Sequence, residues 1–339
     1  MTRIYGQEAR SMTIKEVAGL AGVSSAAVSR YFNGGSLSEE KKERIRKVVE
    51  ETEYVPNLAA HVMRTGRSGL IGVVVPHIHS DSLSQMMSGI VKTAGNEGYT
   101  CILGYSGGSI DREIRIIEGM EKNQMEGIIL MGTGTNKKLR HTIEKCEVPL
   151  VVTGQSYPNI PSVFHDDENA MRDLAGRMLK KRKHIAFIGV SEEDPAAGKA
   201  RRIGVEKAFK DAGRDKEELI HVTADFSVDN GYEVTIKLLR EHPEVDGILA
   251  ASDLIAHGAL RALKESGRKV PKDCGIAGVG NFWADETSDP PITSIKLYFY
   301  ECGEAAVKLL LDMLRAEKGE TGPVPQIKYG YAITERGSI

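Results

Sequence analysis

The stretch TIKEVAGLAGVSSAAVSRYFN, residues 13–33, decides the fold of the N-terminal part of this chain. Thr13 followed three residues later by Glu16 is the pattern of a capping box at a helix start. Gly22 interrupts the helical spacing of apolar residues, and Ser24 can cap a second short helix. Two short helices joined by so few residues cross at a steep angle, which predicts a helix-turn-helix unit.

A third helix is predicted in SEEKKERIRKVVEETEY, residues 38–54, with its few apolar side chains facing inward and its charges outside. Pro56 ends this pattern, and Asn57 could cap a short further helix. We therefore expect a helix-turn-helix domain over residues 12–56, followed by a hinge helix and linker over residues 57–67.

The texture of the sequence changes from residue 68, where short apolar, β-branched runs alternate with helical stretches. The runs are LIGVVVP, YTCILGYS, GIILMGT, PLVVTGQ, HIAFIGVS, LIHVTAD, DGILAAS and CGIAGVG. This alternation predicts α/β architecture with doubly wound parallel sheets, and so many residues favour two lobes over one. Ligands of such folds bind outside the carboxyl ends of the strands.

The expected body, residues 68–339, combines effector binding with dimerisation. We expect its first lobe to comprise about 68–181 and 298–323, and its second lobe about 182–297 and 324–339.

Charge is distributed unevenly between these regions. Residues 1–67 contain 11 Lys and Arg against 8 Asp and Glu, a net charge of +3, and the remainder has 34 against 39, a net charge of −5. The sum is the net charge of −2 of the whole chain. A basic head on an acidic body suggests that the head contacts a polyanion.

Several classes of function find no support in the sequence. No apolar run reaches the roughly 18 residues of a membrane helix, and the opening MTRIYGQEARSMTIKEV lacks the apolar core of a secretory signal, so we expect a cytoplasmic protein without a membrane partner. The four cysteines are far apart and read as reduced thiols. No metal site and no cofactor are expected.

The second helix of a helix-turn-helix places its N-terminal residues toward base edges in the major groove. Hydroxyls of Ser24, Ser25 and Ser29 suit phosphates, the Ala26 methyl suits a thymine methyl, and Arg30 can contact guanine with two hydrogen bonds. A small structural bundle with a solvated Arg is the alternative on spacing alone.

The chain resembles the LacI-type family of bacterial repressors, and the resemblance extends over nearly its whole length. The motifs that carry it are residues 13–33 and YVPNLAAHVMRTGRSGLIGVVVP at 54–76. In that family a helix-turn-helix head is joined through a hinge helix to a two-lobed body like a periplasmic sugar-binding protein. The resemblance implies that the hinge helix pairs with that of a dimer mate and inserts an apolar side chain into the minor groove, here Met63. The DNA-binding residues expected are Thr13, Ser24, Ser25, Ala26, Ser29, Arg30, Asn33, Asn57, Ala60, Met63 and Arg64.

The same resemblance assigns an effector site in the body. RRIGVEKAF places Arg201 at the family's sugar-binding Arg, ADFS places Phe226 at its stacking aromatic, and ASDLIAHGAL places Ser252 and Asp253 in its strand-end motif. Side chains that follow other apolar runs complete the set. The effector-binding residues expected are His77, Ser80, Ser82, Gly132, Gln155, Arg201, Phe226, Ser252, Asp253 and Asn281.

Short segments such as DSLSQ, FHDDENA and GVGN look like the trehalose and sucrose repressors, which respond to disaccharides or their 6-phosphates. His77 stands where relatives often carry Arg, and it is a poorer phosphate ligand. The sequence leaves both effector classes open.

We therefore expect a homodimeric, sugar-responsive repressor that binds a near-palindromic double-stranded operator. A catabolite-control-type regulator with a protein corepressor is an alternative, and a transport-associated sugar-binding protein is a weaker one. An enzyme is not expected, because no nucleophile motif or phosphate loop is present. Asp166 and Asp167, as neighbours in a strand, would face opposite sides.

Overall fold

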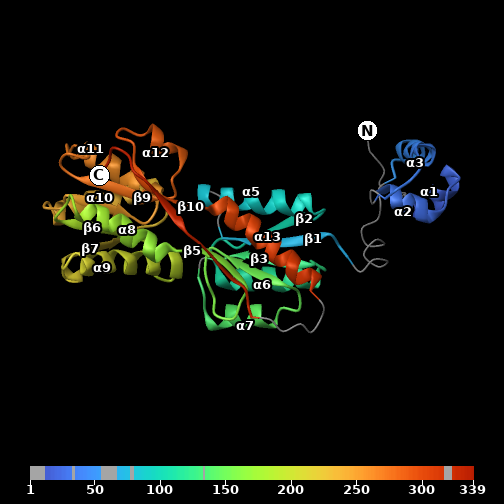
Figure 1. Cartoon of the computed structure of the whole chain (residues 1–339), viewed down its shortest axis with the longest axis horizontal. Coiled ribbons are helices and arrows are strands. Elements are labelled where there is room, and N and C mark those ends of the chain that lie inside the picture. Colours follow the sequence, from blue (N-terminus) through green and yellow to red (C-terminus); the bar gives the residue numbers. More distant parts are fainter. Residues whose placement is uncertain (1–11, 33–34, 55–66, 77–79, 133, 317–322) are drawn as a thin grey trace, which may run out of the picture. The chain divides into compact units, whose positions relative to one another are not determined.

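The computed structural model describes residues 12–32, 35–54, 67–76, 80–132, 134–316 and 323–339. The chain divides into two compact units, which we call the head, residues 1–68, and the body, residues 69–339 (Figure 1).

The head contains three helices: α1 (Ile14–Ala21), α2 (Ser25–Phe32) and α3 (Glu39–Thr52). The predicted capping box is confirmed: the Thr13 hydroxyl accepts the Glu16 backbone N–H at 3.3 Å, and the Glu16 carboxylate accepts the Thr13 backbone N–H at 2.7 Å. Gly22 ends α1 with a φ of 61°, in the left-handed region where glycine carries no steric penalty. The chain therefore turns into α2 within three residues.

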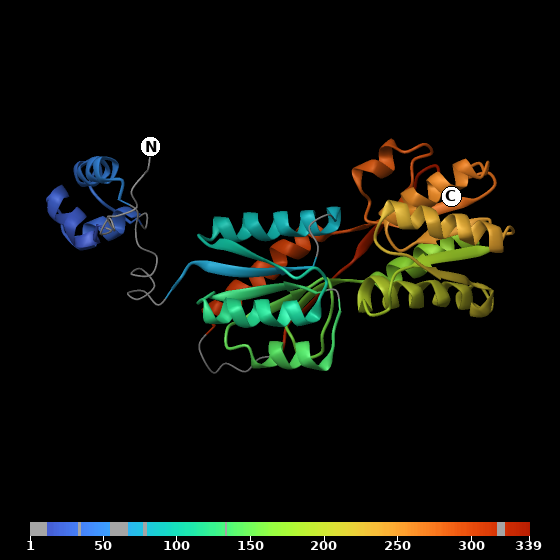
Figure 2. The ribbon, with the colours of Figure 1, turned by 180° about the vertical axis from the view of Figure 1, so that it is seen from behind.

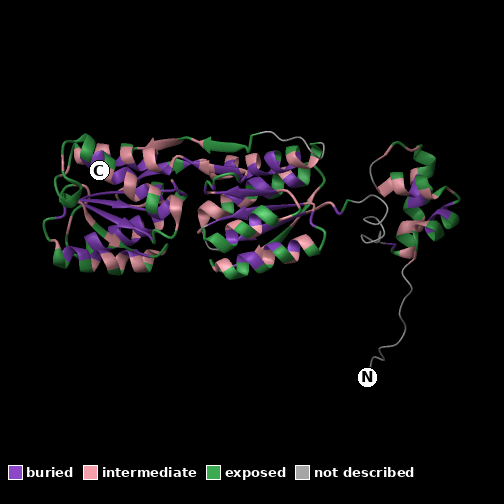
Figure 3. Ribbon diagram, turned by 90° about the horizontal axis from the view of Figure 1, so that it is seen from below, coloured by how far each residue is buried: buried purple, intermediate pink, exposed green. Residues whose placement is uncertain are grey.

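A small apolar core joins these three helices. The buried residues are Val17, Ala18, Ala21, Ala27, Val28, Ile45 and Tyr54. Figure 3 shows buried segments of the head's ribbon among intermediate and exposed ones. The expected helix-turn-helix unit with a third supporting helix is thus present.

The body has two six-stranded sheets, which confirms the predicted doubly wound architecture. The first sheet has the order β11-β5-β4-β3-β1-β2 and is wholly parallel. Its strands are β1 (Leu70–Val75), β2 (Thr100–Tyr105), β3 (Gly127–Met131), β4 (Leu150–Thr153), β5 (Ser162–His165) and β11 (Gln326–Tyr329). Helices α5 (Asp81–Asn96) and α13 (Phe299–Arg315) lie side by side on one face, and α6 (Ile110–Lys122) and α7 (Lys137–Lys145) on the other (Figures 1 and 2).

The second sheet has the order β12-β10-β9-β8-β6-β7, in which only β12 is antiparallel to its neighbour. Its strands are β6 (Ile185–Gly189), β7 (Ile220–Thr223), β8 (Gly247–Ala250), β9 (Gly275–Val279), β10 (Thr293–Leu297) and β12 (Tyr331–Thr334). The helices that pack on it are α8 (Asp167–Leu179) and α9 (Arg201–Asp211) on one face and α10 (Val228–Glu241) and α11 (Asp253–Glu265) on the other. A short helix α12 (Trp283–Thr287) follows β9.

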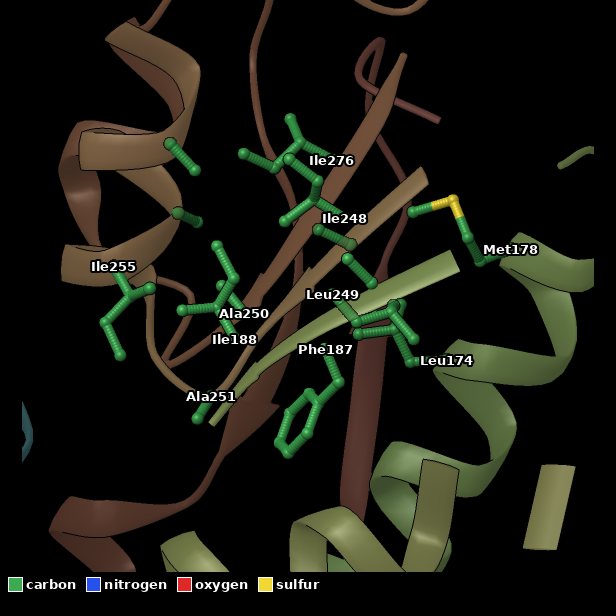
Figure 4. Close-up of a cluster of buried hydrophobic side chains, with 14 of the residues drawn as sticks. Leu174, Met178, Phe187, Ile188, Ile248, Leu249, Ala250, Ala251, Ile255 and Ile276 are labelled. Carbon is green, nitrogen blue, oxygen red and sulfur yellow. The ribbon is translucent and has the colours of Figure 1, made fainter. Parts of the chain in front are cut away.

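Side chains from both faces of the second sheet fill its core. Phe187 and Ile188 on β6 and Ile248 on β8 are fully buried, and Leu174 of α8 and Ile255 of α11 approach them from the two helix layers (Figure 4). The strands β6 and β8 read as continuous apolar runs because they are buried on both faces.

The lobe boundaries differ from those expected. Helix α8 was placed in the first lobe, but its apolar face belongs to the core of the second sheet, so the chain crosses directly after β5. Strand β11 was placed in the second lobe, but it pairs with β5 in the first sheet, and only β12 belongs to the second. The chain therefore crosses between the lobes after β5, after β10 and between β11 and β12.

In the described part of the chain, every helix is too short or too polar to cross a membrane. The same residues contain no group of three or more metal-ligating side chains. All four cysteines are free thiols.

Candidate nucleic-acid interface and ligand cavity

The N-terminus of α2 presents the predicted DNA-reading residues outward. Ser24 caps the helix, because its hydroxyl accepts the Ala27 backbone N–H at 3.3 Å. Ala27 and Val28 point into the head's core. Ser24, Ala26 and Arg30 are exposed, whereas Ser25 and Ser29 are half-buried.

Ala26 and Arg30 lie four residues apart and therefore share one face of α2. A methyl group and a guanidinium on one exposed face can approach base edges closely. Thr13 is exposed as well, but its hydroxyl is already engaged with Glu16. The remaining predicted contacts, Asn33, Asn57, Ala60, Met63 and Arg64, lie outside the described residues.

The body contains a cavity of about 150 Å³ whose walls come from both lobes. We call it the interlobe cavity. Six of the predicted effector residues line it: Ser80, Ser82, Gly132, Arg201, Phe226 and Ser252. Residues that the sequence analysis did not single out line it as well: Leu83, Met86, Gly154, Asp194, Ala197, Leu254, Val279, Phe282 and Phe299.

Arg201 begins α9 and is buried in the wall of this cavity. Its Nε and Nη2 each lie 2.7 Å from Oδ1 of Asp167, and its Nη1 donates to the backbone carbonyl of Ala251. A guanidinium has five N–H donors, so two of them remain for a ligand. Asp167 is the first residue of α8, and Asp166 is its N-cap. The expectation that Asp166 and Asp167 are neighbours in one strand is therefore wrong.

Asp194 is a cavity residue that sequence reasoning missed. Its Oδ1 accepts the backbone N–H groups of Ala196 and Ala197 at 2.9 and 2.8 Å and so caps the π-helical turn η1 (Pro195–Ala200). Burial raises the pKa of Asp194 to about 6. The sequence signal was Asp followed by Pro, a common start of a helical turn.

Three serines and three phenylalanines also line the cavity. Ser80 and Ser82 lie with their Oγ atoms 2.6 Å apart at the start of α5, and Ser252 caps α11 through the Ile255 N–H at 3.3 Å. Phe226 is 45% exposed although it lines the cavity, which leaves its ring face accessible. Apolar rings beside a few convergent polar groups are typical of small-molecule pockets.

Three predicted effector residues are not part of this lining, and His77 lies outside the described residues. Gln155 donates through Nε2 to Asp194 at 3.4 Å. Asn281 accepts a hydrogen bond from Arg336 at 2.8 Å. Asp253 is fully buried and accepts from the Ser294 hydroxyl at 2.7 Å.

Asp253 belongs to a buried acidic cluster behind the cavity wall. Burial, and then the nearby carboxyl of Asp285, raise its pKa well above the usual range of a carboxyl group. Asp285 is fully buried and lies 2.9 Å from the His257 ring. The Phe282 N–H, 3.4 Å from Oδ2 of Asp253, connects this cluster to a ring that lines the cavity.

Together, these features define a two-lobed small-molecule-binding body attached to a helix-turn-helix head. Residues 13–57 match the profile of the bacterial regulatory proteins of the lacI family, and residues 178–339 match a periplasmic binding protein-like domain. Among known relatives, catabolite control protein A of Streptococcus mutans is 28% identical over 331 residues, with 97% of this chain and 98% of the relative covered. The sucrose operon repressor of Staphylococcus xylosus is 28% identical over 304 residues, with 89% and 93% covered.

Solved structures of two transcription regulators share the fold of this chain. The transcriptional regulator CelR in complex with cellobiose aligns with a TM-score of 0.72 and 26% identity, covering 96% of this chain and 99% of that chain. The lac repressor dimer bound to operator shares the fold, with a TM-score of 0.85, 23% identity and coverage of 97% and 99%. The chain therefore carries a DNA-binding domain of the lacI family and a periplasmic binding protein-like domain, and it is a DNA-binding transcription regulator, as these relatives are.

Proposed function

We propose that this protein is a homodimeric repressor of a sugar-utilisation operon, acting in the cytoplasm, and that a neutral sugar in the interlobe cavity releases it from its operator. The observation that carries the proposal is a cavity lined from both lobes by Ser80, Arg201, Phe226 and Ser252. Hydroxyls, a guanidinium and an aromatic face are the groups that recognise a polyhydroxy ring.

The charges around the cavity favour an uncharged ligand over a sugar phosphate. Arg201 is the only cationic side chain among the described lining residues. Its charge is balanced by Asp167 at 2.7 Å, and Asp194 adds an acidic group to the same wall. A phosphate carries about two negative charges near neutral pH and would find no uncompensated cation among these residues.

The size of the cavity suggests how binding is transmitted. Ligand pockets usually measure roughly 300–1,000 Å³, whereas this cavity measures about 150 Å³. A disaccharide therefore requires the two lobes to separate slightly, and a ligand that binds only the wider arrangement shifts the population toward it. Linkage then requires that operator DNA and sugar weaken each other's binding by the same factor.

An exposed apolar surface on the first lobe supports the proposed dimer. Leu103 and Tyr105 on the edge strand β2 are 51% and 52% exposed, and Val91 on the neighbouring helix α5 is 49% exposed. Large exposed apolar side chains gathered on one surface usually mark an interface. Two heads brought together by a two-fold axis would read a near-palindromic operator.

The test is a thermal-shift screen of the full chain with trehalose, sucrose, maltose and cellobiose, and with the available 6-phosphates. A ligand at about a hundred times its dissociation constant stabilises the folded state by roughly 2.7 kcal/mol. We expect a neutral sugar to raise the melting temperature and to release the protein from its operator in a gel-shift assay. Stabilisation by a 6-phosphate alone would contradict the neutral-sugar assignment.

A regulator that needs a protein corepressor is the second candidate, and it is supported by the relatives named catabolite control protein A. In that case a protein partner would increase operator affinity, and no sugar in the screen would decrease it. Measuring operator affinity with purified protein, with each sugar and with a cell extract distinguishes the two functions.

A further inference from the structure

A hydrogen bond between two side chains connects the lobes beside the interlobe cavity. Gln155, which lies after β4 in the first lobe, donates through Nε2 to Oδ1 of Asp194, which lies after β6 in the second lobe, at 3.4 Å. Asp194 lines the cavity, and Gln155 follows the lining residue Gly154 in the chain. The contact therefore joins the two lobes at the edge of the cavity, and we call it the interlobe latch.

The interlobe latch is a weak contact. Its length exceeds the roughly 2.7–3.2 Å of ordinary N–H···O hydrogen bonds. Gln155 is only 2% exposed, and its carbonyl Oε1 is enclosed without a hydrogen-bond partner. An enclosed polar atom without a partner is unfavourable, so it counts against the arrangement in which the latch is closed. A small separation of the lobes is enough to break this bond.

The two carboxylate oxygens of Asp194 have different surroundings. Oδ1 accepts the backbone N–H groups of Ala196 and Ala197 as well as the Gln155 amide. Oδ2 accepts no hydrogen bond from the described residues, and it is not one of their enclosed unpartnered atoms. Asp194 is half-buried and lines the cavity, so a ligand can reach Oδ2 there.

Asp194 complements the other charged residue of the cavity wall. Among the described lining residues it is the only carboxylate, and Arg201 is the only cation. The two residues stand at opposite ends of the π-helical turn η1, because Asp194 caps its start and Arg201 follows its last residue. A carboxylate only accepts hydrogen bonds, and a guanidinium only donates them. A hydroxyl group does both, so neighbouring hydroxyls of an uncharged sugar ring suit this wall.

We infer that Asp194 is a ligand-contacting residue that selects a hydroxyl donor, and that the Gln155 amide holds its carboxylate until the ligand arrives. This inference rests on the proposed function, because it requires that a sugar enters the interlobe cavity and separates the lobes. Separation breaks the interlobe latch and removes one donor from Asp194, and a ligand hydroxyl replaces this donor. The latch and the ligand therefore favour opposite arrangements of the lobes.

The first experiment measures how the sugar affinity depends on pH. Burial raises the pKa of Asp194 to about 6, and an ionised carboxylate accepts a hydroxyl more strongly than the protonated acid does. Isothermal titration calorimetry of the full chain with trehalose, sucrose, maltose and cellobiose is carried out at pH 5 and pH 8. For the sugar that binds, we expect a roughly five- to tenfold lower affinity at pH 5, where most of this carboxyl is protonated.

Asp194→Asn assigns the pH dependence to this carboxylate. The variant keeps an oxygen that caps η1 but does not titrate, so its affinity should be the same at both pH values. The other groups that act on Asp194 electrostatically, Arg201, Asp167 and Tyr157, are unchanged in it. Equal wild-type affinities at the two pH values, or the same pH dependence in Asp194→Asn, would overturn the ligand contact.

The second experiment tests the interlobe latch. Gln155→Met keeps an unbranched side chain but removes the donor, so the narrow arrangement loses its bond to Asp194, and we expect the sugar affinity at pH 8 to rise at least threefold. Ser156→Ala is the matched control, because it removes a hydrogen bond of 2.7 Å to Gln326 that lies within the first lobe, and its affinity should equal that of the wild type. An unchanged affinity in Gln155→Met, or an equal gain in Ser156→Ala, would contradict the latch.

The outcomes separate this inference from the proposed function. A sugar that binds with the expected pH dependence but does not release operator DNA would count against the proposed function alone. A sugar that releases operator DNA and binds equally well at both pH values would overturn the contact with Asp194 alone. Absence of binding by all four sugars up to their solubility limits, in the wild type and in Gln155→Met, would overturn both.

Discussion

The two functional surfaces of this protein are built in opposite ways. In the head, three of the residues proposed to contact DNA, Ser24, Ala26 and Arg30, are exposed, and their neighbours Ala27 and Val28 belong to the core. In the body, Arg201, which we propose contacts the ligand, is itself a buried structural residue, paired with the buried carboxylate of Asp167. DNA recognition can therefore change with little effect on stability, whereas changes in the cavity affect stability and ligand binding together.

The largest expected effect comes from breaking the buried ion pair. Arg201→Ala leaves the Asp167 carboxylate buried without its partner, which typically costs 3–5 kcal/mol, so we expect a loss of about 4 kcal/mol in the unfolding free energy of the second lobe. Far-UV circular dichroism in a urea titration measures this unfolding. The variant should still bind operator under folding conditions but should no longer be released by sugar.

An exposed ion pair on the same lobe supplies the control. Arg172 and Asp211 lie 2.5 Å apart with side chains 43% and 49% exposed, and surface pairs contribute about 0–1 kcal/mol. If Arg172→Ala destabilises the lobe as much as Arg201→Ala does, burial is not what distinguishes the two pairs. A sugar response retained by Arg201→Ala would remove Arg201 from the ligand site.

The cavity also predicts a pH dependence through Asp194. Its pKa rises from the ordinary 3.8 to about 6 in the folded protein. A group whose pKa is raised on folding stabilises the fold at low pH, and this stabilisation is lost as pH rises through about 6. Asp194→Asn keeps a capping oxygen but does not titrate, so wild-type stability relative to this variant should fall by about 3 kcal/mol between the two pKa values.

Urea titrations of both proteins at a series of pH values measure this difference. Asp211→Asn changes a half-exposed carboxyl whose pKa is lowered by its hydrogen bond to Arg172, so above pH 3.8 it should leave the profile unchanged. A constant stability difference between wild type and Asp194→Asn across the range would mean that Asp194 is ionised in the fold at every pH tested.

A substitution on the exposed face of α2 should change the affinity for DNA and leave the free energy of unfolding of the head nearly unchanged. Arg30→Ala removes an exposed guanidinium from the reading face of α2, and the loss at the specific operator should be about 1–3 kcal/mol with little change for random DNA. Operator and random-sequence affinities measured at one salt concentration test this, with the exposed Lys47→Ala of α3 as the control. An equal loss on both DNAs would make Arg30 a phosphate contact.

Much of the fold could be predicted from local patterns alone. The capping box at Thr13, the glycine turn at Gly22 and the strand–helix alternation all depend on residues close in sequence. The strands β5, β10, β11 and β12 were not recognised among the apolar runs. Strand β10 carries Thr, Ser and Lys, and β11 and β12 are edge strands without a buried residue, so none reads as a continuous apolar run.

The site was predictable only in part, for a similar reason. Arg201 and Ser252 belong to recognisable motifs, and both line the cavity. The partner of Arg201 is Asp167, which lies 34 residues earlier in the chain, so only the packing of α8 against α9 brings the two together. Asp194 was missed because an Asp-Pro pair reads equally well as an ordinary turn.

The smallest expected effect concerns Thr13, where a structural and a DNA-binding role compete. Its hydroxyl accepts the Glu16 N–H, and loss of such a cap costs about 1 kcal/mol. Thr13→Ala should therefore accelerate amide hydrogen exchange at Val17 and Ala18 in α1 roughly fivefold, and Thr13→Ser should restore it. If operator affinity falls in Thr13→Ala by more than this loss of helix stability explains, the hydroxyl also contacts DNA. If affinity falls only as far as α1 frays, Thr13 is a capping residue and the reading surface of the head begins at α2.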